Sequence, residues 1–196
     1  MEKYVITIAR QFGSMGRPIA KRMAEELGIH YYDRDIVEKT AEKMGLPVSV
    51  ISEHEEKTKH PFYRMQFPLG RDTIDTQEDI FRTQKEIILE LAEKSSCIVV
   101  GRCSDYILQH FPNRMSVYIY ASYESRLKNC INLLHMQQTE AERMITEVDR
   151  ARELYHKRFA GCSQEDLRMK NIMIDSGILG AENTARALCE IIRMKY

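Results

Sequence analysis

The chain has no tryptophan, no net charge and no long hydrophobic run. Lysine plus arginine and aspartate plus glutamate each number 29, so no overall field draws the protein toward nucleic acid or a membrane surface. No stretch approaches the length of a membrane span. We therefore expect no DNA, RNA or membrane partner, and any anion binding must come from the local placement of arginines.

Cysteine is sparse, and its spacing is irregular: the five cysteines lie far apart and include no C-x-x-C pair. This pattern argues against a disulfide framework or a zinc site and is typical of a reducing compartment. The short apolar run near the N-terminus is interrupted by Arg10, which argues against a signal peptide. We expect a cytoplasmic protein that forms one domain over residues 1–196, with a homo-oligomer left open.

Short apolar runs alternate with amphipathic segments along the chain. Five runs predict strands, and the first is apolar nearly throughout, as in a strand buried on both faces. The predicted strands are Tyr4–Ala9, Ile29–Tyr32, Cys97–Val100, Met115–Ala121 and Asn171–Asp175. Strands that alternate with helices predict an α/β fold, in which a parallel sheet carries helices on both faces.

Helical spacing and capping residues predict the segments between the strands. Ser122 is positioned to cap one helix, and Thr139-Glu140-Ala141-Glu142 matches a capping box. The first predicted helix ends at Gly28, and the second runs to about Met44. The third covers about Thr76–Lys94, and the fourth follows Ser122. The fifth runs from Thr139 to roughly Ala160, and the last covers Ala181–Met194. The stretch His60–Asp72 has two prolines and a glycine, which predicts a loop or hinge.

The first strand leads into RQFGSMGRP, a loop of small residues before a helix. In parallel sheets, ligands bind beyond the carboxyl ends of the strands. Gly13, Ser14 and Gly16 let backbone N–H groups converge, and a helix N-terminus with Arg17 at its mouth favours an anion. Against the phosphate-loop pattern G-x-x-x-x-G-K-S/T, Arg17 replaces the lysine and Pro18 the hydroxyl residue. The segment is an altered phosphate loop or, alternatively, a tight turn without a ligand.

Charged residues also follow the second and third predicted strands. Asp33-Arg34-Asp35 places two carboxylates around an arginine, a set suited to a metal or a substrate hydroxyl. Alternatively, Asp33 caps the next helix. Arg102 follows the third strand, with Asp105 about one helical turn later. Arg102 either holds a substrate phosphate or pairs with Asp105.

The helix predicted to end near Ala160 has an arginine in its apolar stripe. At helical spacing, one narrow stripe contains Ile145, Val148, Arg152, Tyr155 and Phe159. An inward arginine is costly unless it meets an anion or a carboxylate, so Arg152 is a candidate to bind a phosphate. A side chain that snorkels over the core is the alternative. Arg150 lies on the opposite face, which favours solvent unless the helix breaks locally.

These segments, taken in order, resemble the cytidylate kinase-like family, a branch of the P-loop kinases related to bacterial cytidylate kinase and more distantly to shikimate kinase. The resemblance covers nearly the whole chain. It rests on ITIARQFGSMGR, YYDRDIV, CIVVGRCSDYIL, VYIYASYESRLK, VDRARELYHKRF and IDSGILG. It implies a three-layer P-loop NTPase fold with a five-stranded parallel sheet, a substrate-binding or hinge segment at about residues 34–95, and a helical lid at about 137–168.

The resemblance also implies roles for the candidate residues. The loop Gly13–Arg17 would hold the donor phosphates of ATP, and Asp33 would lie near Mg²⁺ as its ligand. Arg102 looks like the arginine that contacts the acceptor nucleotide in cytidylate kinase. Arg152, with Arg150, looks like the lid arginines that clamp the transferring phosphoryl group.

Several positions depart from the pattern of the family. Cytidylate kinases have lysine where Arg17 stands, aspartate where Cys103 stands and an acidic residue where Val100 stands. The loop of the family usually reads Gly-Ser-Gly-Gly, whereas Met15 takes the third place here. These departures bear on the acceptor and on turnover, and hardly on the fold. Cys103, without an evident histidine partner, is more often inert than nucleophilic.

The sequence thus predicts an ATP-dependent phosphotransferase that acts on a small acceptor, with a nucleoside monophosphate such as CMP as one candidate. The catalytic residues would be Arg17, Asp33 and Arg152. The donor would be bound by Gly13, Ser14, Met15, Gly16, Arg17 and Pro18. The acceptor would be bound by Arg34, Asp35, Arg102, Asp105 and Arg150.

Two other functions fit the same residues. The missing lysine and hydroxyl favour a nucleotide- or anion-binding module without turnover. The DRD segment after the second strand resembles the D-S-D element of shikimate kinase, which fits a kinase of a non-nucleotide small molecule.

Overall fold

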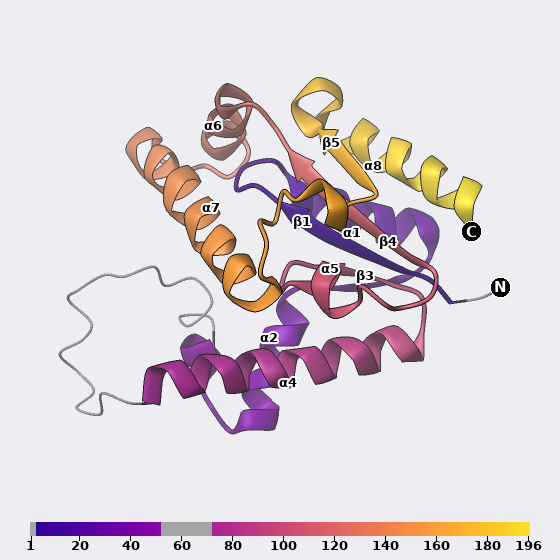
Figure 1. The fold of residues 1–196 in the computed structure, drawn as a ribbon. Helices are drawn as coiled ribbons and strands as arrows, with labels where there is room; N and C mark the ends of the chain where they lie inside the picture. Colours follow the sequence, from indigo (N-terminus) through magenta and orange to yellow (C-terminus); the bar gives the residue numbers. More distant parts are fainter. Residues whose placement is uncertain (1–2, 52–71) are drawn as a thin grey trace.

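The computed structural model describes residues 3–51 and 72–196 and has a β-sheet at its centre (Figure 1). The strands are β1 (Val5–Arg10), β2 (His30–Tyr32), β3 (Cys97–Val100), β4 (Arg114–Tyr120) and β5 (Ile172–Asp175). They lie in the order β2-β3-β1-β4-β5, and every neighbouring pair is parallel. The prediction of a five-stranded parallel sheet is confirmed, because each predicted strand is found with ends that differ by a single residue at most.

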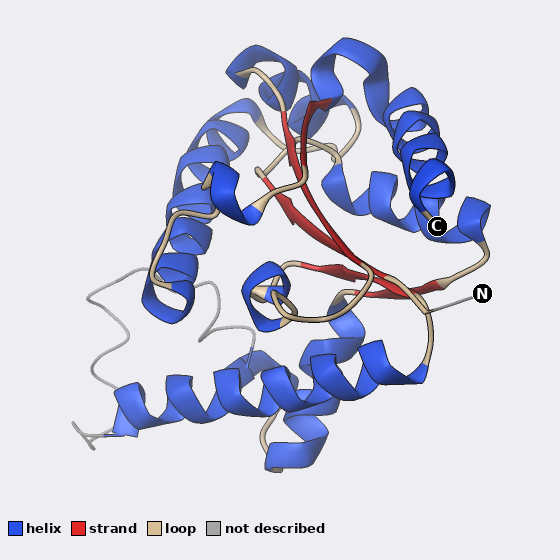
Figure 2. Cartoon of the chain, turned by 45° about the vertical axis from the view of Figure 1, so that its right-hand side comes forward, coloured by secondary structure: helices blue, strands red, loops and turns tan. Residues whose placement is uncertain are grey.

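Helices cover both faces of this sheet (Figure 2). They are α1 (Gly16–Leu27), α2 (Arg34–Met44), α4 (Asp72–Lys94), α5 (Ser104–Ile107), α6 (Tyr123–Asn132), α7 (Gln138–Ala160) and α8 (Ser176–Lys195), with a short 3-10 helix η2 (Leu167–Met169). Helices α1 and α8 pack on one face, whereas α2, α4 and α5 pack on the other. The result is the predicted three-layer architecture, with α7 close to the end where β1 and β3 finish.

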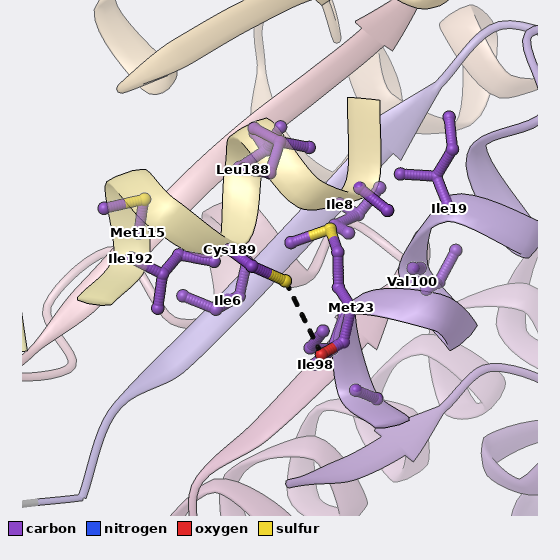
Figure 3. Packing of buried hydrophobic residues seen from close by; sticks show 14 of the residues in the cluster. Ile6, Ile8, Ile19, Met23, Ile98, Val100, Met115, Leu188, Cys189 and Ile192 are labelled. Carbon is purple, nitrogen blue, oxygen red and sulfur yellow. Dashed lines mark hydrogen bonds between the residues drawn. The ribbon is translucent and has the colours of Figure 1, made fainter. Parts of the chain in front are cut away.

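The larger part of the core lies between the sheet and helices α1 and α8 (Figure 3). Ile6 of β1 and Ile98 of β3 pack there against Met23 of α1 and Leu188 of α8, and all four are fully buried. Val5, the neighbour of Ile6, packs on the opposite face with α4 and α5. Alternate residues of β1 therefore fill both faces, as its continuous apolar run predicts.

The first helix after β4 begins as predicted, whereas α7 does not. Ser122 caps α6, and its Oγ accepts a hydrogen bond of 3.2 Å from the N–H of Ser125. The predicted capping box at Thr139 is wrong, because α7 already begins at Gln138. Glu142 instead accepts a hydrogen bond of 3.0 Å from the Gln138 amide, one turn earlier on the same helix.

The last helix is longer than the sequence indicates. It begins at Ser176, after Asp175 accepts a capping hydrogen bond of 2.8 Å from the N–H of Gly177. Gly180 has a φ of 72°, which kinks the helix, and the predicted Ala181–Met194 is the part beyond this kink. The loop predicted over residues 60–72 lies, except for its last residue, outside the described residues. In the ranges 3–51 and 72–196, no helix is long and apolar enough to cross a membrane.

Candidate active site

A cavity beyond the carboxyl ends of β1 and β3 brings four arginines together. Arg10, Arg17, Arg102 and Arg152 all line it, although they come from four separate segments of the chain. Apolar residues of β1 and α7 form part of its wall. Since guanidinium groups stay protonated at neutral pH, this cavity is suited to a ligand with several negative charges.

The loop between β1 and α1 makes close contacts with backbone carbonyl oxygens. Gly13 has a φ of 77°, and a Cβ there would lie 2.9 Å from the carbonyl oxygen of Arg126 in α6. The Ser14 Oγ is 2.9 Å from the carbonyl oxygen of Gln11 and 3.1 Å from that of Ile119, so its proton is used within the fold. The Ser14 hydroxyl therefore does not replace the hydroxyl that is missing at Pro18.

Gly16 is the position where the loop approaches Arg10 most closely. A Cβ on Gly16 would lie 2.7 Å from the Cβ of Arg10. We expect Gly16→Ala to displace Arg10, to lower the free energy of unfolding by about 1–3 kcal/mol, and to weaken pyrophosphate binding several-fold. Gly28→Ala is the control: alanine is disfavoured there by the φ of 65° and not by a close contact, because the space around Gly28 is open. Urea unfolding and calorimetric titration with pyrophosphate check this prediction, and unchanged pyrophosphate affinity in Gly16→Ala contradicts it.

Asp33 lies at the end of β2, between two of the arginines. Its carboxylate is 2.6 Å from the Nε of Arg17 and 3.8 Å from Nη2 of Arg10. The Tyr31 hydroxyl donates to it at 3.3 Å, and burial together with the charge of Asp33 raises the pKa of Tyr31 to about 12. Asp33 directly precedes α2. Among the described residues, however, the Asp33 side chain makes no hydrogen bond that caps this helix. The alternative that Asp33 caps the next helix is therefore wrong, and Asp33 instead forms ion pairs with the two arginines.

Asp33 is the carboxylate of this region that could hold a magnesium ion together with phosphates. Among the residues that the structure describes, no three His, Cys, Asp or Glu side chains form a group that could hold a metal. Mg²⁺ is commonly held by one or two carboxylates together with substrate phosphates. Asp33 supplies one carboxylate beside the phosphate loop, whereas Pro18 supplies no hydroxyl.

Arg102 and Arg152 reach the cavity from β3 and from α7, respectively. Arg102 follows Gly101 at the end of β3 with a φ of 57°, and burial and the charge of Arg10 lower its pKa to about 10, so it stays protonated at neutral pH. Arg152 extends from α7, and its Nη1 donates a hydrogen bond of 3.1 Å to the carbonyl oxygen of Arg10. The inward position predicted for Arg152 is therefore observed.

Asp149 and Arg126 attach α7 to the phosphate loop. The N–H of Phe12 donates to the Asp149 carboxylate at 2.7 Å, and Arg126 of α6 donates both to that carboxylate and to the carbonyl oxygen of Phe12. Neither residue is among the site residues predicted from the sequence. Their signal in the sequence is weak, because acidic and basic residues are common on both sides of these helices.

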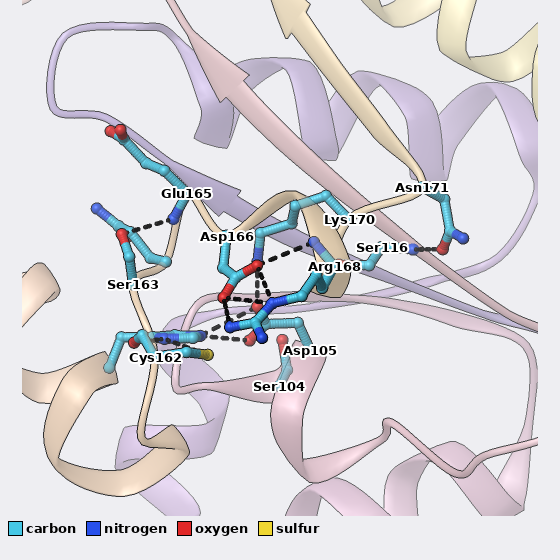
Figure 4. Close-up of polar contacts among 12 residues, drawn as sticks. Ser104, Asp105, Ser116, Cys162, Ser163, Glu165, Asp166, Arg168, Lys170 and Asn171 are labelled. Carbon is cyan, nitrogen blue, oxygen red and sulfur yellow. Dashed lines mark hydrogen bonds and ion pairs between the residues drawn. The ribbon is translucent and has the colours of Figure 1, made fainter.

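Asp105 has a different environment from the one that its predicted role implies. It lines the cavity, but its carboxylate accepts hydrogen bonds from His156 of α7 and from Lys170, which precedes β5 (Figure 4). All three side chains are buried. Burial alone would raise the pKa of Asp105, but the hydrogen bond from His156 and the charge of Lys170 lower it to about 2. Asp105 is therefore engaged in anchoring α7.

Nine of the predicted site residues do not line the cavity: Gly13, Ser14, Met15, Gly16 and Pro18 of the loop, and Asp33, Arg34, Asp35 and Arg150. Arg34 and Asp35 begin α2 and are exposed, and Arg34 forms an ion pair of 3.7 Å with Glu38. Arg150 is exposed on α7, as its position opposite the inward stripe indicates. Cys103 does line the cavity, but burial raises the pKa of its thiol well above the usual value, which disfavours a nucleophilic thiolate.

The family model described as the cytidylate kinase-like family matches residues 5–178. The chain belongs to this family. The match spans β1 to the start of α8 and thus includes every arginine of the cavity. The comparison with curated proteins gave no match.

Solved structures with the same fold include an uncharacterized protein and two shikimate kinases. An uncharacterized protein from Eubacterium ventriosum is 23% identical with a TM-score of 0.73, and the alignment covers 97% of this chain and 99% of that one. Shikimate kinase from Acinetobacter baumannii, in complex with shikimate, is 15% identical with a TM-score of 0.55, covering 98% and 94%. Shikimate kinase from Bacteroides thetaiotaomicron is 10% identical with a TM-score of 0.57, covering 97% and 98%. These likenesses confirm the P-loop NTPase fold, and membership of the cytidylate kinase-like family supports a phosphotransferase.

Proposed function

We propose that this member of the cytidylate kinase-like family transfers the γ-phosphoryl group of ATP to a small anionic acceptor, of which a nucleoside monophosphate such as CMP is the first candidate. The proposal depends on one observation above all: Arg17, Arg102 and Arg152 line a single cavity beside the N-terminus of α1. Phosphoryl transfer needs aligned reactants and stabilised charge more than it needs a nucleophilic side chain, and guanidinium groups around one cavity would serve both needs.

The donor would bind at the loop of residues 13–18. Its backbone N–H groups and the N-terminus of α1 favour phosphate oxygens. Arg17 would turn from Asp33 to the β- and γ-phosphates, since its side chain is 55% exposed and has room to move. Asp33, released from Arg17, would hold Mg²⁺, which supplies neutralising charge on the phosphates when it is bound.

The acceptor would bind on the side of β3. Arg102 would hold its anionic group. Arg10 lines the same cavity and would add a second guanidinium. Arg152 would stabilise the negative charge of the transferring group as the bond to ADP breaks. Arg34 and Asp35 are exposed here and would contribute only if α2 approached the acceptor after binding.

A binding module without turnover is the second candidate, and the loop itself favours it. Arg17 is held by Asp33 at 2.6 Å, and the hydroxyl of Ser14 is directed at backbone carbonyl oxygens. In such a protein, ATP binding would shift Arg17 without transfer of a phosphoryl group.

A panel of acceptors distinguishes these functions. The protein is incubated with Mg-ATP and, in turn, CMP, dCMP, UMP, AMP, GMP, shikimate and a hexose, and ³¹P NMR follows ADP and the phosphorylated product. We expect product from at least one nucleoside monophosphate at a rate well above ATP hydrolysis alone. Tight ATP binding by calorimetry without any product supports the binding module, and product from shikimate or the hexose alone assigns a non-nucleotide acceptor.

A further inference from the structure

A buried charge cluster joins α7 to the rest of the fold beside the cavity. It consists of Asp105 on α5, His156 on α7 and Lys170 ahead of β5, whose side chains are 4%, 5% and 1% exposed (Figure 4). Charges buried to this extent destabilise a fold unless their partners are well placed. The roles proposed above for the arginines do not account for His156 or Lys170.

The histidine ring is bound through both of its nitrogens. Nδ1 lies 2.8 Å from the carbonyl oxygen of Cys162, and Nε2 lies 3.1 Å and 3.2 Å from the two carboxylate oxygens of Asp105. A carbonyl oxygen and an ionised carboxylate can only accept hydrogen bonds, so both ring nitrogens must donate. Only the protonated imidazolium carries a hydrogen on each nitrogen. In either neutral tautomer, one nitrogen lone pair would face an oxygen lone pair.

His156 and Arg152 are one turn apart on α7 and therefore share a face of the helix. Both line the cavity. Arg152 donates to the carbonyl oxygen of Arg10 at 3.1 Å, so its guanidinium is placed by the position of α7 over the end of β1. The bonds from His156 to Asp105 and Cys162 hold this end of α7, whereas Asp149 holds the helix near the phosphate loop.

We propose that protonated His156 is a positioning residue, which holds α7 so that Arg152 faces the reacting phosphoryl group and which releases this arrangement when it loses its proton. The proposal rests on the proposed phosphotransfer and deepens it, because it makes the lid arginine dependent on pH. His156 itself touches neither donor nor acceptor in this scheme.

The charges around the ring determine the direction of the pH effect. Burial lowers the pKa of His156, but the hydrogen bond and charge of Asp105 outweigh burial and Lys170, and the pKa is raised above its usual value of about 6.5. The thiols of Cys162, whose Sγ is 4.0 Å from Nδ1, and of Cys103 have pKa values raised by burial. The folded state thus binds the His156 proton more tightly than the unfolded state does. Its stabilising effect is complete below about pH 6.5 and is lost as the pH rises through the raised pKa.

An NMR titration of the whole protein tests the positioning role without any assay of activity. The ¹⁵N signals of the His156 ring and of the Arg152 Nε–Hε group are followed from about pH 6 to about pH 9, the range in which histidine changes charge. We expect His156 to titrate above its usual pKa and the Arg152 signal to move with the same midpoint. In His156→Gln the Arg152 signal should be displaced already at low pH and insensitive to further titration. His110→Gln, at an exposed histidine, should behave as the wild type.

Kinetics with the best acceptor add a second readout. We expect His156→Gln to lower kcat by up to on the order of 10²-fold, with little change in KM for ATP, because misplacement by about 1 Å has effects of that size. An Arg152 signal that ignores the titration of His156 overturns the positioning role, and so does an unchanged kcat in His156→Gln. A wild type that transfers no phosphoryl group, but in which Arg152 follows His156, contradicts the proposed function and leaves the positioning intact. If His156→Gln does not fold, the wild-type titration still decides.

Discussion

Arg152→Ala is expected to lower the rate of phosphoryl transfer by on the order of 10³-fold, at the lower end of the effect of an arginine that stabilises the transferring group. Arg152 is the only one of the four cavity arginines that α7 supplies, and it reaches the carbonyl oxygen of Arg10 at the end of β1. In the proposed reaction, its charge would stabilise the negative charge that develops as the γ-phosphoryl group leaves ADP. The measurement is kcat with the best acceptor of the panel, at saturating Mg-ATP.

Arg143→Ala is the matched control for this prediction. Arg143 lies on the same helix, its side chain is 57% exposed, and it pairs with Glu147 at 3.8 Å on the outer face. The substitution removes the same charge from α7 without entering the cavity, so kcat should stay close to that of the wild type. Full activity in Arg152→Ala would show that the charge of Arg152 is not used in the transition state. Arg152→Lys should recover only part of the rate, since a lysine lacks the planar fork.

Asp105→Asn should be the most destabilising single substitution near the cavity. It keeps the shape of the side chain but leaves Lys170 and protonated His156 buried without their carboxylate. Removing one partner of a buried ion pair destabilises proteins by about 3–5 kcal/mol, and a loss of that size lowers the unfolding midpoint of a chain of this length by roughly 10 °C. Calorimetric or circular-dichroism melting at neutral pH measures it.

The pH dependence of this loss follows from the pKa of Asp105, which is lowered to about 2. The unfolded chain binds the proton more readily, so the carboxylate stabilises the fold above about pH 4, and this contribution is lost as the pH falls toward 2. The difference in unfolding midpoint between the wild type and Asp105→Asn should therefore become smaller as the pH falls from about 4 to about 2. Asp79→Asn is the control, because the Asp79 side chain is 55% exposed and pairs with Arg82 on the surface of α4, so the unfolding midpoint of this variant should be nearly unchanged. Equal midpoints for wild type and Asp105→Asn at neutral pH would mean that the cluster does not stabilise the fold.

The arrangement of strands was predictable from local pattern. Runs such as CIVV and YVITIA are apolar because both faces of a central parallel strand are covered by helices, and this burial is written into consecutive residues. The carboxyl ends of such strands then indicate where a ligand binds. Arg17 and Arg102 could be singled out in this way, and Arg152 could be singled out from the apolar stripe of its helix; the structure brings all three to one cavity.

Helix starts were predicted less well, because a local capping pattern does not by itself fix the residue at which a helix begins. The capping box at Thr139 fits its pattern, yet one more residue, Gln138, joins α7, and Glu142 bonds to that residue instead. Ser122, by contrast, caps α6 as expected. Side-chain capping is worth only about 1 kcal/mol, so small tertiary preferences suffice to move a helix end.

The sequence by itself determined the layered α/β fold, the family and the position of the phosphate loop, since periodicity, glycines and strand ends are all properties of neighbouring residues. Only the tertiary structure decided the partners of the charges. It showed that Arg10 joins the cavity, that Asp33 pairs with Arg17 instead of capping α2, and that Asp105 binds His156 and Lys170. These pairs join residues 16 to 65 positions apart. Which charge meets which depends on how the helices pack across the sheet, and no local pattern of residues encodes that packing.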